Sequence, residues 1–68
     1  MDKDLVLKNN LKQVRTEQKI FQEELAKMVG TTRQTIIAIE KGTFSPTAKL
    51  ALLLSIAINK KFEELFFF

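Results

Sequence analysis

The 68-residue sequence contains no cysteine and no histidine. Without cysteine, disulfides and thiolate metal sites are excluded. Without histidine, the chain lacks the commonest metal ligand and the usual proton shuttle at neutral pH. Only scattered carboxylates, lysines and threonines are left for catalysis. We therefore expect no enzyme, no cofactor, no metal site and no small-molecule substrate.

Long hydrophobic runs are also missing. The longest apolar stretch, residues 50–58, is too short to span a bilayer and is interrupted by Ser55. Asp2, Lys3 and Asp4 precede any apolar run, which is unlike a signal peptide. The sequence therefore predicts a cytoplasmic protein without membrane contact.

The chain is short and mildly basic, with a net charge of +3 and a pI near 9.5. So small a chain buries little apolar surface, so we expect one domain, residues 1–68, that benefits from a partner. The positive balance suits a polyanion such as DNA, although an acidic membrane surface would also attract it.

Glycine and proline are scarce, and the few turn-forming residues divide the chain into short helical segments. Gly30, Gly42, Pro46 and Asn59 are the main breaks. Apolar spacing between them predicts helices over residues 8–19, 22–29, 33–41, 48–58 and 62–65. The fold class is therefore all-α, a compact five-helix domain. The apolar residues 5–7 and 65–68 suggest in addition a short two-stranded ribbon that pairs the termini.

Residues 22–41 have the spacing of two short helices that cross at a steep angle. Ala26 lies four positions before Gly30, and Ile36 and Ile39 lie six and nine positions after it. A small residue permits the close crossing, glycine permits the turn, and the two isoleucines anchor the second helix. One face of that second helix is then left free.

The free face carries side chains suited to DNA. Arginine pairs with guanine, glutamine with adenine, and threonine or alanine methyl groups contact the thymine methyl. A capping hydroxyl at Thr32 and the free N–H groups at the helix start suit a phosphate, and Gln22 begins the helix that would cross the DNA backbone. The residues on the free or partly free surface are Arg33, Gln34, Thr35, Ile37, Ala38 and Lys41.

These motifs resemble the helix-turn-helix family of Cro and the phage repressors, also called the xenobiotic-response-element type. The resemblance covers residues 10–66, nearly the whole chain. It rests on residues 22–26, Gly30, residues 33–36, 39–42 and 45–47, Leu50 and residues 63–66. Three features depart from the family pattern, one of which is the additional apolar surface of Leu53 and Ile56 on the fourth helix. Phe21 replaces the usual serine or threonine cap of the second helix, a loss of about 1 kcal/mol, and Ile37 replaces a polar residue.

The resemblance implies a role for each matching position. Gln22 would contact the DNA backbone, and Thr32 would cap the recognition helix near a phosphate. Arg33, Gln34 and Ala38 would face the bases. The remaining implied contacts are Lys41 and the loop amides around Thr43 with the far phosphate strand, and a structural ion pair between Arg15 and Glu40.

Small members of this family are usually transcriptional regulators that act as homodimers. The sequence thus predicts a sequence-specific DNA-binding transcriptional regulator. We expect it to repress transcription, because no separate activation or effector domain is evident. Two copies would place their recognition helices in successive major grooves of a near-palindromic operator.

The C-terminal region, residues 48–68, has more apolar side chains than a core of this size needs. Phe62 and Phe66 are expected to cap the core, and the rest would form an exposed patch that marks an interface. We expect a symmetric dimer contact formed by Leu53, Ile56, Phe66, Phe67 and Phe68. The alternative is an antitoxin-type protein that masks a protein partner through the same face.

Overall fold

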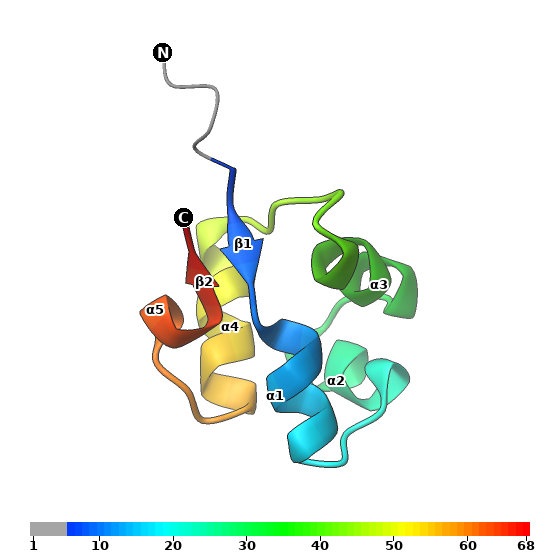
Figure 1. The fold of residues 1–68 in the computed structure, drawn as a ribbon. Helices are drawn as coiled ribbons and strands as arrows, with labels where there is room; N and C mark the ends of the chain where they lie inside the picture. Colours follow the sequence, from blue (N-terminus) through cyan, green and yellow to red (C-terminus); the bar gives the residue numbers. More distant parts are fainter. Residues whose placement is uncertain (1–5) are drawn as a thin grey trace.

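The computed structural model describes residues 6–68, which form five helices and a two-stranded ribbon (Figure 1). In chain order these elements are β1 (Lys8–Asn9), α1 (Leu11–Glu17), α2 (Gln22–Val29), α3 (Arg33–Lys41), α4 (Ala48–Ala57), α5 (Phe62–Leu65) and β2 (Phe66–Phe67). The five-helix class and the terminal ribbon predicted from the sequence are both confirmed.

The ribbon is antiparallel, with Lys8 opposite Phe67 and Asn9 opposite Phe66. It therefore involves later residues of the N-terminal segment than the expected residues 5–7, of which Leu5 lies outside the described part of the chain. The first helix is correspondingly shorter than predicted. Residues 8 and 9 are strand rather than helix, because the backbone N–H of Asn10 donates to the carbonyl of Leu65 and holds this segment extended.

Local sequence explains where the central helices begin and end. The hydroxyls of Thr32 and Thr47 accept the backbone N–H groups of the residues three positions later, which caps α3 and α4. Gly30 and Gly42 end α2 and α3 with φ of 74° and 81°, a left-handed conformation that glycine adopts without strain. The turn after α4 uses Asn59 in the same region, with φ of 55°.

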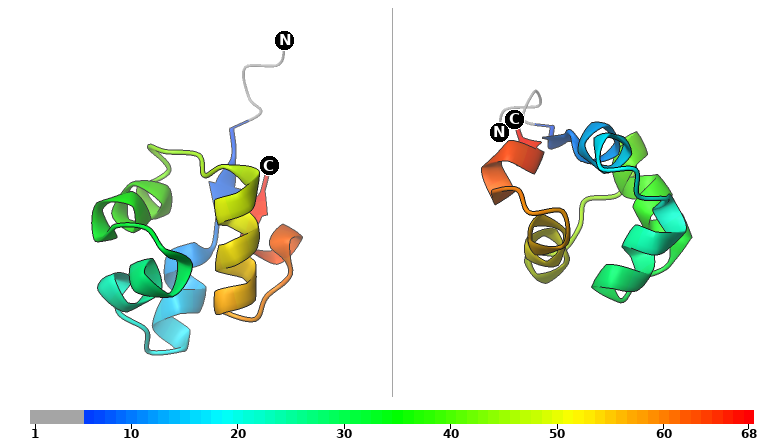
Figure 2. Two further views of the ribbon diagram at one scale, coloured as in Figure 1. Left: turned by 180° about the vertical axis from the view of Figure 1, so that it is seen from behind. Right: turned by 90° about the horizontal axis from the view of Figure 1, so that it is seen from below.

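The helices surround one apolar core to which every helix contributes. Its fully buried side chains are Leu11, Leu25, Ile36, Ile39, Leu54, Ile58 and Leu65. Two views of the ribbon show α2 and α3 together on one side of the molecule and α5 with β2 on the opposite side (Figure 2). Within residues 6–68, no helix has the length and apolar character needed to cross a membrane.

Candidate nucleic-acid interface

Helices α2 and α3 pack against each other through a tight turn. Gly30 adopts positive φ there, and the N–H of Thr31 donates to the carbonyl of Ala26 at 2.9 Å. Ala26 is buried, as are Ile36 and Ile39, the two residues predicted to anchor α3. The opposite face of α3 is consequently directed outward.

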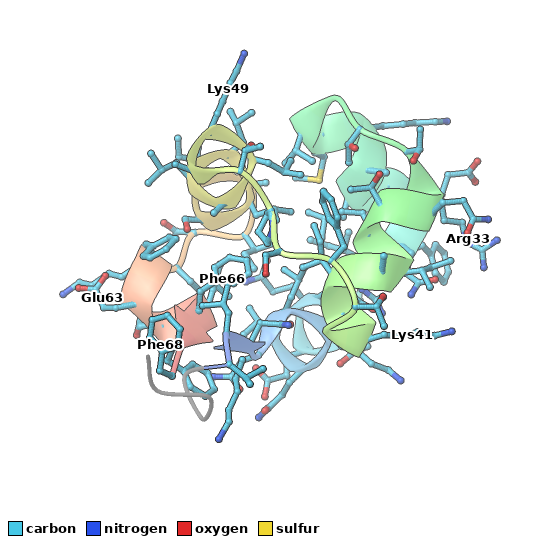
Figure 3. All side chains as sticks on the ribbon, turned by 90° about the horizontal axis from the view of Figure 1, so that it is seen from above. Arg33, Lys41, Lys49, Glu63, Phe66 and Phe68 are labelled. Atoms are coloured by element: carbon cyan, nitrogen blue, oxygen red, sulfur yellow. The ribbon has the colours of Figure 1, made fainter. Side chains whose placement is uncertain are left out.

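The outward face of α3 bears the side chains that the sequence assigned to DNA. Arg33, Gln34 and Lys41 are exposed, while Thr35, Ile37 and Ala38 are half-buried. Arg33 and Lys41 project from α3 away from the core, on the side opposite Phe68 (Figure 3). The molecule therefore has a polar and cationic side, formed by α3, that is far from its C-terminal side.

The first turn of α3 is held by two threonines. The Thr32 Oγ1 atom accepts the backbone N–H of Thr35 at 3.3 Å and lies 3.0 Å from the Thr35 hydroxyl. The hydroxyl of Thr35 is thus already hydrogen-bonded within the helix. Thr35 can therefore offer a base its methyl group and the remaining hydrogen-bonding capacity of its hydroxyl.

Beneath this surface, the carboxylate of Glu40 receives three hydrogen bonds. Arg15 donates from Nε at 2.6 Å and from a terminal nitrogen at 3.2 Å, and Gln22 Nε2 donates at 3.0 Å. A further Arg15 nitrogen donates to the carbonyl of Ile20 at 2.8 Å. The ion pair implied by the resemblance therefore lies in contact, and it joins α1 and α3 to the start of α2.

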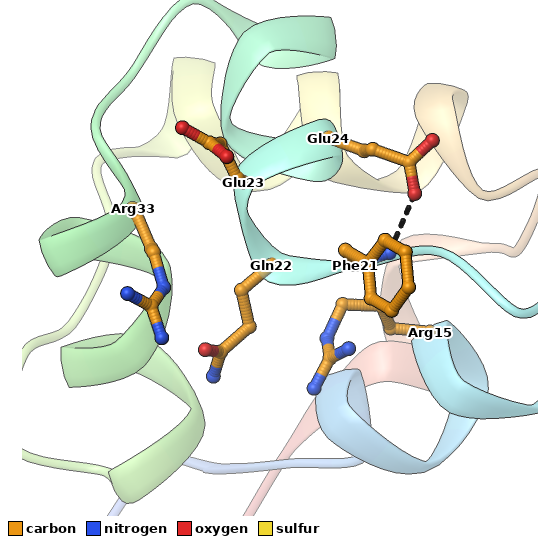
Figure 4. A pocket seen from close by; sticks show the side chains of 6 residues that line it. All are labelled: Arg15, Phe21, Gln22, Glu23, Glu24 and Arg33. Carbon is orange, nitrogen blue, oxygen red and sulfur yellow. Dashed lines mark hydrogen bonds between the residues drawn. The ribbon is translucent and has the colours of Figure 1, made fainter.

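A hollow opens between the starts of α2 and α3. Arg15, Gln22 and Arg33 line it together with Phe21, Glu23 and Glu24 (Figure 4). The two guanidinium groups and the Gln22 amide lie along one side, whereas the Glu23 and Glu24 carboxylates are directed to the other. The carboxylates of Glu23 and Glu24 thus do not point toward the two guanidinium groups.

The start of α2 has no side-chain oxygen that caps the free N–H groups of its first turn. Phe21 has no capping oxygen, but its backbone N–H donates to the side chain of Glu24 at 2.8 Å. Glu23 and Glu24 also lie in the first helical turn, where negative charge suits the helix dipole. The Phe21 ring is left exposed and lies next to the Arg15 side chain in Figure 4.

The loop after α3 returns onto the helix end. The backbone N–H of Thr43 donates to the carbonyl of Ala38 at 3.0 Å, and its hydroxyl donates to the same carbonyl at 3.2 Å. Phe44 follows with its ring about half exposed. Thr43 is thus held against the C-terminal end of α3, close in sequence to Lys41, the last residue of the helix.

Comparison with known proteins decides what this arrangement is. A family model described as helix-turn-helix matches residues 11–65, which include all five helices. The chain belongs to the helix-turn-helix family of the Cro and phage-repressor type. Its members are DNA-binding transcriptional regulators, and double-stranded DNA is the partner that this membership implies.

Relatives of this helix-turn-helix chain match it over most of their length. A helix-turn-helix-type transcriptional regulator of Methanocaldococcus jannaschii is 45% identical over 62 residues, covering 91% of this chain and 94% of the relative. One from Bacillus subtilis is 43% identical over 60 residues, covering 88% and 91%. The crystal structure of the restriction-modification controller protein C.AhdI from Aeromonas hydrophila has a TM-score of 0.75 at 28% identity, covering 79% of this chain and 82% of that one.

The C-terminal side of this helix-turn-helix domain differs from the sequence prediction at two phenylalanines. Phe66 is only 3% exposed, because the strand β2 turns its ring into the core, where the Phe62 ring packs against it with centroids 5.5 Å apart. Phe66 therefore caps the core as expected, and its assignment to the dimer surface is wrong. Phe62, expected to cap the core, is instead 43% exposed.

The other residues assigned to that surface remain accessible to different degrees. Ile56 and Phe68 are 76% and 69% exposed, Phe67 is partly exposed, and Leu53 is half-buried against the core. The sequence analysis missed Leu52, which is exposed on α4. Its spacing of four residues from Ile56 places both on one helix face and was the signal that would have identified it.

Proposed function

We propose that this chain is a sequence-specific transcriptional regulator that inserts α3 into the DNA major groove. The observation that carries the proposal is the division of α3 into two faces. Ile36 and Ile39 are buried, and the opposite face carries exposed Arg33, Gln34 and Lys41 on a cationic side of the molecule. A helix held in this way is free to enter a groove of about 12 Å width.

The proposed contacts fall into two groups. Phosphate contacts would hold the protein in register, through Gln22, Thr32, Lys41 and Thr43. Base contacts would select the sequence, through Arg33, Gln34, Ala38 and the apolar atoms of Thr35 and Ile37. The hydrogen bonds of Gln22 to Glu40 and of Thr43 to Ala38 support this division, because they fix the residues that flank α3.

We further propose that the protein acts as a homodimer and as a repressor. The exposed Leu52 and Ile56 on α4, and the exposed Phe67 and Phe68 at the end of the chain, support a contact between two copies. This surface lies away from α3, so both recognition helices would stay accessible. A two-fold dimer would present them about 34 Å apart on a near-palindromic operator, where occupancy blocks transcription.

The decisive experiment is a salt titration of DNA binding by the full chain. A duplex from the promoter of its own gene and a random-sequence duplex are compared by fluorescence anisotropy. We expect tight promoter binding and weaker, strongly salt-dependent binding to the random duplex. Binding to neither duplex at low salt contradicts the proposal.

Two lysines provide a matched control for this titration. Lys41 is exposed at the end of α3, and Lys49 is exposed on α4, away from it (Figure 3). Lys41→Ala should weaken binding to both duplexes and reduce the salt slope by about 1. Lys49→Ala removes the same charge and should leave both unchanged. Equal effects of the two variants would mean that only net charge drives binding.

A second candidate function is an antitoxin-type module that binds a different protein through its C-terminal side. The exposed Ile56 and Phe68 favour it as much as they favour self-association. Sedimentation equilibrium of the purified chain separates the two hypotheses. A dimer at micromolar concentration supports self-association, whereas a monomer that leaves the apolar surface uncovered supports a different protein partner.

A further inference from the structure

Asn9, the second residue of β1, is hydrogen-bonded at both ends of its side-chain amide. Its Nδ2 donates to the carbonyl of Ile39 at 2.9 Å, and its Oδ1 accepts the backbone N–H of Leu11 at 3.1 Å. These two partners determine the orientation of the amide. The carbonyl of Ile39 requires the Nδ2 donor, and the N–H of Leu11 requires the Oδ1 acceptor. The side chain therefore connects the start of α1 to the last turn of α3.

The Ile39 carbonyl lies at a critical point of the recognition helix. The last four carbonyls of an α-helix have no partner within the helix, and the Ile39 carbonyl belongs to this group. It accepts the N–H of Gly42 at 3.0 Å as well as the Asn9 amide. Lys41 and the loop through Thr43, the proposed phosphate contacts, come directly after it. A hydrogen bond here therefore acts on the part of α3 that meets the DNA backbone.

The backbone of the same residue belongs to the terminal ribbon. Asn9 is opposite Phe66 in the antiparallel pair, and β1 lies between β2 and α3 (Figure 1). The next residue, Asn10, strengthens this attachment. Its backbone N–H donates to Leu65 at 2.9 Å, and its side-chain amide donates to the carbonyl of Glu64 at 3.1 Å. The side chain and the backbone N–H of Asn10 thus bond only to the C-terminal segment, while its carbonyl accepts the N–H of Val14 in α1. Asn9 bonds both to the C-terminal segment and to α3.

We propose that Asn9 is a positioning residue that couples the C-terminal ribbon to the DNA-contacting end of α3. This inference rests on the proposed function of α3. Asn9 itself is half-buried and bonds to the carbonyl of Ile39, so its role is assigned through α3 and not through a contact with DNA. Its role is to fix the helix end and the loop that follows it, so that the base contacts and the phosphate contacts are made in a single register.

The test uses Asn9→Asp, which retains the acceptor for Leu11 but removes the donor to Ile39. The matched control is Asn10→Asp, which introduces the same charge on the adjacent residue and removes the donor to Glu64. The ratio of promoter affinity to random-duplex affinity should fall about tenfold in Asn9→Asp, the effect of one part-buried hydrogen bond. It should change less than twofold in Asn10→Asp at a comparable loss of thermal stability.

A neutral variant separates the loss of the hydrogen bond to Ile39 from the negative charge that Asn9→Asp introduces. Asn9→Ala removes the donor without adding a carboxylate, and the affinity ratio should fall as it does in Asn9→Asp. A normal ratio in Asn9→Ala would overturn the proposal, because the effect of the aspartate would then be electrostatic repulsion of DNA. An equal fall in Asn10→Asp would also overturn it, because general loosening would then explain the result.

Amide hydrogen exchange without DNA tests the coupling independently of the proposed function. The N–H groups of Gly42 and Thr43, which donate to the end of α3, should exchange about tenfold faster in both Asn9 variants. Those of α2 should be unchanged. Unaltered exchange at Gly42 and Thr43 would exclude the coupling even if the wild-type chain binds DNA. Failure of the wild-type chain to bind DNA would reject the proposed function, while accelerated exchange would still identify the link.

Discussion

The carboxylate of Glu40 receives three hydrogen bonds, two from Arg15 and one from Gln22. Its side chain is 4% exposed, and that of Arg15 is 8% exposed. Removing one member of such a buried pair leaves an uncompensated charge, whereas a surface pair is worth little. The position of α3 against α1 and α2 therefore depends strongly on this one residue.

We predict that Glu40→Ala lowers the free energy of unfolding by about 3 to 5 kcal/mol. The single variants Arg15→Met and Glu40→Leu each leave one buried charge unpaired. The double variant Arg15→Met/Glu40→Leu leaves none, so its loss of stability should be smaller than the sum of the two single losses. Urea denaturation measures the free energy of unfolding of each variant. Exposed Glu17 is the control, and Glu17→Ala should change stability by no more than about 0.5 kcal/mol. Additive losses in the double variant would contradict the argument.

Gln34 provides a prediction about sequence selection. It is exposed on the outward face of α3 and lies in the first helical turn. Gln34→Ala should remove discrimination at one base pair, at a cost of about 1 to 3 kcal/mol, with the fold unchanged. A panel of promoter duplexes with single base-pair substitutions measures this. If the variant has the same base preference as the wild type, Gln34 does not select the sequence.

At the scale of elements, α3 and α4 begin in the same way but are expected to differ in function. Thr32 and Thr47 each cap a helix through one hydrogen bond, at 3.3 and 3.1 Å. Thr32→Ala and Thr47→Ala should each lower the free energy of unfolding by about 1 kcal/mol. Only Thr32→Ala should in addition weaken DNA binding, because its hydroxyl lies at the proposed phosphate contact. Parallel denaturation and anisotropy measurements test this, and equal DNA affinities would argue against that contact.

These caps also explain how much of the fold was predictable from the sequence. Thr32, Thr47, Gly30 and Gly42 act on their immediate neighbours, so the bounds of α2 and α3 follow from local chemistry. The strand at Lys8–Asn9 was not predicted, because two residues give no pattern and their pairing depends on where Leu65 enters the core. For the same reason the sequence placed Phe66 both in the core and on the dimer surface, since the side chains of a strand can be assigned to faces only from a known starting point.

The candidate site was predictable to a similar degree. The outward residues of α3 follow from the spacing of Ile36 and Ile39. The pairing of Arg15 with Glu40 was inferred through resemblance, because nothing local joins residues 25 positions apart. The bond of Gln22 to the same carboxylate was missed, since it depends on the crossing of α2 and α3 in three dimensions.

At the scale of the whole molecule, the exposed face of α4 carries the prediction about assembly. Ile56 is 76% exposed, so a charge there should not disturb the fold. Ile56→Lys should shift sedimentation equilibrium toward monomer and weaken promoter binding, because one recognition helix alone contacts too few bases. Met28→Lys introduces the same charge at an exposed apolar position on α2 and is the control. A dimer that persists in Ile56→Lys would place the interface elsewhere.

The terminal ribbon has a consequence for the order in which this chain folds. The α2–α3 pair forms between neighbouring segments, whereas the contact of Asn10 with Glu64 joins residues 54 positions apart. Closing so long a loop has a large entropic cost that is recovered only when both ends are in place. We therefore expect the helix pair to assemble early and the ribbon to close last. During folding, α3 would then pack against α2 before Asn9 forms its hydrogen bond to the last turn of α3.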